Sequence, residues 1–125
     1  MTHTELLKAG RDQLLSLHKS LVDLERTGYE GVHGEVTAAQ FLSLLLENPD
    51  FAWLRKFSTL IVDIDEMFAQ KDGFSDEAVE AHLSKLRSIV QMTGEDQDFI
   101  AKYERAIQQD IDVAAKQAEL RRLLS

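Results

Sequence analysis

The chain has 125 residues, the size of one domain, and a domain of this size buries roughly two thirds of the surface that its unfolded chain exposes. It contains no cysteine, which excludes disulfide frameworks, thiolate metal sites and cysteine nucleophiles and fits a reducing compartment. The 22 acidic residues outnumber the 14 lysines and arginines, and the formal net charge of −8 disfavours nucleic acid as a partner. No stretch has the pattern of a membrane span or a secretory signal. We therefore expect a cytoplasmic protein with no membrane partner.

The first predicted helix runs from Thr2 to a glycine cap at Gly34. Thr2 followed by Glu5 has the spacing of a capping box, and Gly34 suits a left-handed cap after Val32 or His33. Between these ends, apolar residues recur at spacings of three, four and seven, as one face of a helix requires. They are Leu7, Leu14, Leu17, Leu21 and Leu24.

Two helices are predicted in the middle of the chain. Thr37 and Gln40 form a second capping box and open a short helix that carries Phe41, Leu42, Leu45 and Leu46. Asn48 precedes the single proline, Pro49, which suits the start of a third helix. The third helix has a broad apolar stripe made of Trp53, Leu54, Phe57, Leu60, Ile61, Ile64, Met67 and Phe68.

Two more helices complete the prediction. Gly73 ends the third helix, and Ser75 caps a fourth helix that ends at Gly94. The apolar face of the fourth helix is Val79, Leu83, Leu86 and Val90. A single last helix is predicted from about Asp96 to Leu124, with one face made of Ile100, Tyr103, Ile107, Ile111, Ala114 and Ala118.

No window alternates with the period of two that a strand requires. We therefore predict one all-α domain over residues 1–125, an antiparallel helical bundle of four long helices plus one short crossover helix.

The four histidines do not fit a known metal pattern. Only His33 follows a glutamate, Glu30, by three residues, so the two Glu-x-x-His pairs of the di-iron carboxylate signature are absent, and we predict no metal and no cofactor. His18 and His82 each border an apolar stripe. Such residues are usually packed histidines with one polar partner, and this is the favoured interpretation. The alternative is that the two rings meet in the core and form a titratable pair that binds a ligand.

Polar residues gather at the end of the first helix, where Glu25 and Tyr29 are one turn apart. The simplest interpretation is a solvated helix end. The alternative is a groove with two walls, formed by His18, Glu25 and Tyr29 on one side and by Trp53 or Arg55 on the other. A lone tryptophan on an apolar stripe belongs to the core more often than to a ligand site.

Two aspartates need separate interpretation. Asp110 lies on the face of the last helix that is expected to be buried, where a carboxylate requires a partner such as Arg11 or His18, or else lies at the rim of an interface. Asp65 does not share the outward face of Asp63 and Glu66 on the third helix. It is a candidate because an acid such as Asp65 or Asp110 could join His18 and His82 in an irregular metal or ligand site.

No nucleophile, base and oxyanion site can be assembled from the sequence, so we predict no catalytic residues. The third helix is apolar over more than half its circumference, and the last helix continues into Leu120, Leu123 and Leu124. This surplus predicts a non-catalytic interaction or regulatory module that forms a homodimer and binds a protein partner. The alternative is a bundle that binds a small ligand or metal. The candidate binding residues are His18, Glu25, Tyr29, Trp53, Asp65, His82 and Asp110.

Overall fold

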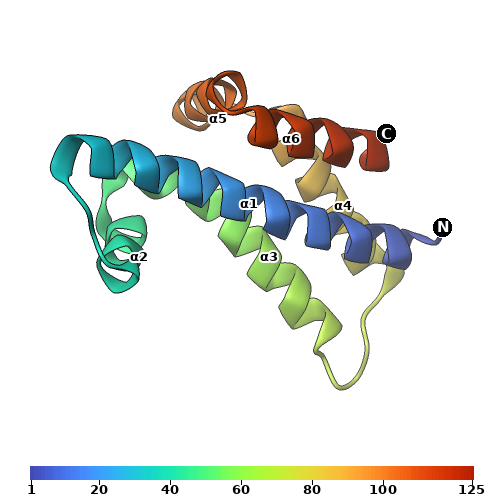
Figure 1. Ribbon diagram of the computed structural model, residues 1–125. Helices are drawn as coiled ribbons and strands as arrows, with labels where there is room; N and C mark the ends of the chain where they lie inside the picture. Colours follow the sequence, from blue (N-terminus) through green and yellow to red (C-terminus); the bar gives the residue numbers. More distant parts are fainter.

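A computed structural model describes all 125 residues, and every regular element in it is helical (Figure 1). The all-α class predicted from the sequence is confirmed. The elements in chain order are α1 (His3–His33), α2 (Ala38–Glu47), the 3₁₀ turn η1 (Pro49–Leu54), α3 (Arg55–Phe68), α4 (Asp76–Gln91), α5 (Gln97–Gln109) and α6 (Ile111–Leu124). None of these helices combines the length and the apolar character that crossing a bilayer requires.

The central element is α1, whose ends agree with the prediction. The Thr2 hydroxyl accepts a hydrogen bond from the backbone N–H of Glu5, and the N–H of Gly34 bonds to the carbonyl of Glu30. Gly34 has φ 89° and ψ 170°, so its φ is positive but its conformation is not the left-handed helical one that was expected. The capping box is incomplete, because the Glu5 carboxylate accepts a bond from the Thr2 hydroxyl rather than from the Thr2 backbone. Four fully buried leucines form one stripe along α1: Leu7, Leu14, Leu17 and Leu21.

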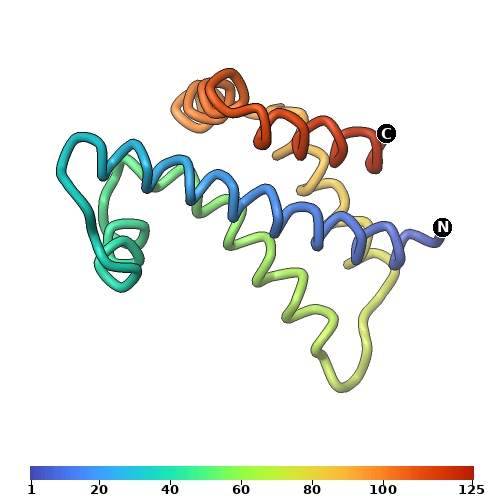
Figure 2. The backbone as a smooth tube through the Cα atoms, viewed as in Figure 1, coloured from blue at the N-terminus to red at the C-terminus, as the bar shows by residue number.

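The helices α3, α4 and α6 all pack on α1, and Figure 1 shows α6 above it and α3 crossing below it. The direction of α3 is opposite to that of α1, because Arg11 contacts Asp65 while His18 stacks on Phe57 further along. Gly10 lets α4 approach α1 closely, since a Cβ at this position would lie 2.7 Å from a methyl carbon of Leu86 on α4. Both chain ends lie on the same side of the molecule (Figure 2).

The predicted third helix begins with a 3₁₀ turn. The Asn48 side chain accepts a hydrogen bond from the N–H of Asp50 at 2.9 Å, so the predicted cap is confirmed, but α-helical geometry starts only at Arg55. With about three residues per turn, a 3₁₀ helix puts residues three apart on the same side. Phe51 and Leu54 have this spacing, and both are buried. The tighter geometry therefore turns both side chains into the core.

The end of α4 differs slightly from the prediction. Gly94 was the expected stop, but the helix ends at Gln91 and Met92 adopts the left-handed conformation, with a φ of 55°. The N–H of Thr93 then bonds to the carbonyl of Ser88 at 3.1 Å, as in a Schellman motif. Met92 packs against the hydrophobic core, and this contact offsets the cost of a positive φ at a residue with a side chain.

The prediction of a single last helix from Asp96 to Leu124 is wrong, because the chain is extended at Asp110, with φ −133° and ψ 119°. The Asp110 carboxylate accepts the N–H of Val113 at 3.0 Å and caps α6, so it does not lie on a buried helical face. The break also changes which face is buried, and Ile111, expected in the core, is 89% exposed. The residues that α6 buries are Val113, Gln117, Leu120 and Leu124. Figure 2 shows the sharp turn between α5, seen nearly end-on, and α6.

Gln117 is buried, and apart from the aromatic residues it is the only buried residue with a polar side chain. Its side chain connects three helices. Its amide nitrogen donates to the carbonyl of Val90 on α4 at 2.6 Å, and its amide oxygen accepts from the hydroxyl of Tyr103 on α5. Burial raises the pKa of Tyr103, so the phenol stays protonated and remains a donor. These two hydrogen bonds, which we call the Gln117 relay, hold α5 and α6 at an angle to one another.

We expect Gln117→Met to lower the free energy of unfolding by about 1–3 kcal/mol, because it leaves the buried Tyr103 hydroxyl without an acceptor. Tyr103→Phe should also destabilise the fold. The double variant should cost less than the sum of the two, since it leaves neither partner orphaned. Urea unfolding followed by circular dichroism measures all three values, and strictly additive costs would contradict the relay.

Replacing Asp110 tests the helix break. Asp110→Ala should lower the free energy of unfolding by about 0.5–2 kcal/mol, because the first turn of α6 loses its N-cap. Asp110→Asn retains a side-chain oxygen and should cost much less. If chemical denaturation gave the alanine variant wild-type stability, the Asp110 side chain would not contribute as the N-cap of α6.

Candidate functional site

A cavity of about 310 Å³ lies where the end of α1 meets η1 and α5. We call it the Glu25 pocket, and its lining residues are Glu25, Gly28, Tyr29, Val32 and His33 from α1, Asp50 and Phe51 from η1, and Lys102 and Arg105 from α5. The structure thus brings two of the candidate residues, Glu25 and Tyr29, into one pocket. Its second wall comes from η1 and α5, and not from Trp53 or Arg55.

Glu25 is a half-buried carboxylate that makes no hydrogen bond and no ion pair. Burial raises its pKa, while the positive charges of Lys102 and Arg105 act in the opposite direction. Lys102 is already engaged, because its ammonium lies 3.2 Å from the carbonyl of Asp50 and 3.3 Å from the carboxylate of Asp98. Arg105 is exposed and makes no hydrogen bond or ion pair. The carboxylate of Asp50 also has no ion pair, so the pocket holds two unpaired carboxylates and one unpaired guanidinium.

Aromatic rings form the rest of the pocket wall. The ring of Tyr29 lies 4.4 Å from the ring of His33 and 6.1 Å from that of Phe51, measured between centroids. Phe51 in turn packs edge-on against Phe41 of α2 at 5.4 Å. The pocket is thus joined to the one buried residue of α2 by a continuous set of rings.

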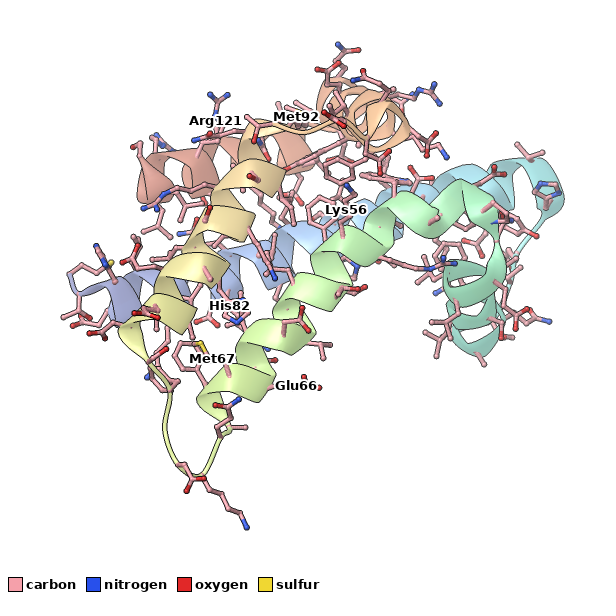
Figure 3. The ribbon with its side chains drawn as sticks, turned by 180° about the vertical axis from the view of Figure 1, so that it is seen from behind. Lys56, Glu66, Met67, His82, Met92 and Arg121 are labelled. Atoms are coloured by element: carbon pink, nitrogen blue, oxygen red, sulfur yellow. The ribbon has the colours of Figure 1, made fainter.

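The two candidate histidines lie in different places. His18 is half-buried and stacks on Phe57, and burial lowers its pKa, which keeps the ring neutral at pH 7. His82 lines a separate cavity of about 540 Å³ together with Met67, and Figure 3 shows these two side chains facing one another between α4 and α3. Phe57 and Met67 are separated by about 15 Å of helical rise, so the structure does not bring the histidines together.

The His82 cavity is acidic, since Asp63, Glu66 and Asp72 also line it. The Nδ1 atom of His82 is buried there without a hydrogen-bond partner. Nowhere in the chain are three or more histidine, cysteine, aspartate or glutamate side chains arranged to hold a metal ion.

The remaining candidate residues have structural contacts. Asp65 of α3 forms a bidentate ion pair with Arg11 of α1, in which Nε and Nη2 of the guanidinium donate to the two carboxylate oxygens at 2.9 and 2.8 Å. Asp110 caps α6, and Trp53 is buried among aromatic rings. The guanidinium of Arg55 binds the carbonyls of Leu45 and Leu46 at the end of α2.

Sequence reasoning missed an exposed apolar surface on α2. Only Phe41 of this helix is buried, while Leu42 is 57% and Leu46 is 65% exposed. We define the α2 face as Ala38, Leu42, Leu45 and Leu46, which fall within about 100° of one another around the helix. Figure 1 shows α2 projecting away from α4, α5 and α6. The composition of α2 could have indicated this surface. The helix has five large apolar residues and one charged residue, and one side of so short a helix cannot bury all five.

The surplus apolar surface is therefore not where the sequence suggested. Leu120 and Leu124 of α6 are buried, and Val62 is the only large apolar residue of α3 that is highly exposed, at 51%.

Comparison of the chain with protein-family models, with curated proteins and with solved structures finds no match in any of the three. Function is therefore inferred from the residues of this chain alone.

The raised pKa of Glu25 predicts how stability depends on pH. Because this pKa is higher in the folded than in the unfolded chain, the contribution of Glu25 is fully present below the unfolded-state pKa and is lost as the pH rises through the folded-state pKa. Glu25→Gln, which mimics the protonated form, should therefore stabilise the protein at pH 7 by up to about 1 kcal/mol, a small value because the group is half-exposed. The gain should vanish near pH 4. Thermal unfolding between these pH values measures it, and a gain that grew on acidification would contradict the assignment.

Proposed function

We propose that this chain is a non-catalytic interaction or regulatory module that forms a homodimer through the α2 face. The observation that supports the proposal is the exposure of Leu42 and Leu46 on a helix that buries a single residue. In this proposal α1, α3, α4 and the α5–α6 pair act as one helical bundle, and α2 projects from it as the docking element.

Charge favours a second copy of the chain as the occupant of this face. A net charge of −8 makes two copies repel each other over most of their surfaces, but the α2 face itself carries no charge. The single charged residue of α2 is Glu47, at its C-terminal end. In an antiparallel pair of α2 helices, each Glu47 lies beside the N-terminus of the other helix, where the helix dipole favours a negative charge. A two-fold contact of this kind is also closed, so it stops at a dimer.

The size of the face sets the expected strength of the dimer. Burying a leucine that is more than half exposed contributes about 1 kcal/mol or more, and the two copies together offer four such side chains. One helix of ten residues presents less than the roughly 800 Å² per partner of a stable complex. We therefore expect a dimer that dissociates on dilution.

We expect Leu42→Asp and Leu46→Asp each to weaken dimerisation at least about tenfold, or about 1.4 kcal/mol, because each places a charge in the centre of an apolar contact. Both positions are exposed in the single chain, so helicity measured by circular dichroism should not change. Sedimentation-velocity ultracentrifugation over a range of protein concentrations measures the equilibrium.

Val62→Asp is the matched control, since Val62 is comparably exposed but lies on α3. This variant should dimerise like the wild type. A wild-type chain that stayed monomeric at the highest concentration, or a Val62→Asp variant that lost the dimer equally, would overturn the proposal.

A further inference from the structure

The Glu25 pocket has two carboxylates without an ion pair, from Glu25 and Asp50, and one guanidinium without an ion pair, from Arg105. Glu25 reaches it from α1 and Arg105 from α5, and neither makes a hydrogen bond or ion pair within the chain. We propose that this pocket binds a small zwitterion of the α-amino acid class, with the ligand ammonium at Glu25 and the ligand carboxylate at Arg105. This site is independent of the dimer proposed above, because none of the α2 face lines it.

Volume restricts the class of ligand. Small-molecule sites range from about 300 to 1,000 Å³, and the volume of this pocket, about 310 Å³, is at the lower limit. A free amino acid suits such a space, whereas nucleotides and most cofactors are larger. The pocket is also concave and bounded on three sides, by α1, η1 and α5.

Charge then requires both signs on the ligand. A purely cationic ligand would satisfy Glu25 and leave the guanidinium of Arg105 facing a second positive charge. A purely anionic ligand would bind Arg105 and bring a negative charge towards Glu25. A zwitterion pairs with both, and a guanidinium binds a carboxylate through two parallel hydrogen bonds. Lys102 does not compete for the ligand carboxylate, because Asp98 and the Asp50 carbonyl already hold it.

The uncharged part of the pocket fits the remainder of such a ligand. Tyr29 and Phe51 offer aromatic surface, and Val32 adds an aliphatic side chain. An ammonium group gains further stabilisation from a nearby aromatic face. Gly28 is an exposed lining residue, and a Cβ at this position would meet no atom within 4 Å. The ligand side chain therefore has apolar surface to contact and room to occupy.

The probes that test this site are free amino acids together with their one-charge analogues. Leucine, phenylalanine and methionine are each titrated into the full ¹⁵N-labelled chain, beside the amine without the carboxylate and the acid without the ammonium. Chemical-shift changes locate the site and give the affinity. We expect at least one amino acid to shift the amides of Glu25, Tyr29 and Arg105 and to bind at least about tenfold more tightly than either analogue.

Four variants complete the experiment. Glu25→Gln and Arg105→Gln should each weaken binding at least about tenfold, because each removes one of the two charge-assisted contacts. Gly28→Leu fills the pocket and should abolish binding. Gly31→Leu is its matched control, since Gly31 is also an exposed glycine of α1 with open space around it but does not line the pocket. It should bind like the wild type.

Three results would overturn the inference. The first is that no amino acid binds at millimolar concentration. The second is that an amine or an acid analogue binds as tightly as the amino acid, which would make the site one for a single charge. The third is that Gly31→Leu loses binding together with Gly28→Leu. The dimer-disrupting Leu42→Asp variant should retain the ligand, so a failure of one proposal is distinguishable from a failure of the other.

Discussion

The leucine stripe of α1 is the surface on which the rest of the chain folds. The α3–α4 hairpin and α6 cover it from different sides, and Gly10 lets α4 approach closely. With 31 residues, α1 is about 46 Å long, whereas α3 has 14 residues and covers only part of that length. The last turns of α1 therefore extend past the main core, and their polar residues face η1 and α5 instead of a full helical partner. The Glu25 pocket is a consequence of this mismatch in helix length.

The same overhang explains the position of α2. After α1 ends, the chain reverses direction towards the core, and hydrogen bonds from α1 hold the loop that leads into α2. Arg26 donates to the carbonyl of Val36 at 2.7 Å, and the Glu30 carboxylate accepts the N–H of Val36 at 2.9 Å. Arg55 binds the carbonyls at the other end of the helix. Both ends of α2 are held by hydrogen bonds and Phe41 is its only buried anchor. Leu44 and Leu45 pack at the edge of the core, while Leu42 and Leu46 are left exposed.

Local signals predicted the starts of α1, α2, α4 and α5, because a cap depends on residues that are close together in sequence. The predicted stop of the third helix at Gly73 was wrong, since α3 ends at Phe68. The break at Asp110 was missed for a related reason: aspartate is tolerated inside a helix as well as at its start, and the spacing of apolar residues continued past it. The choice between a continuous helix and a new helix that starts after Asp110 depends on how α6 packs, with Gln117 buried in the core. For the site, the one-turn spacing of Glu25 and Tyr29 predicts that they share one face of the first helix, and both line the same pocket. Their opposite wall, with Arg105, comes from a helix about 80 positions away, and no periodicity within one helix identifies a contact of that kind.

Trp53 is the single tryptophan, and its indole lies about 6 Å from the rings of Phe57, Phe99 and Tyr103, with its N–H unbonded. The intrinsic fluorescence of the protein therefore comes from one dry environment, between η1, α3 and α5. Its emission should lie at short wavelength and move to the red when water reaches the indole. A separation of α5 from η1 would shift the emission wavelength of Trp53 even if every helix stayed intact. Tryptophan fluorescence therefore reports on this contact without an added label.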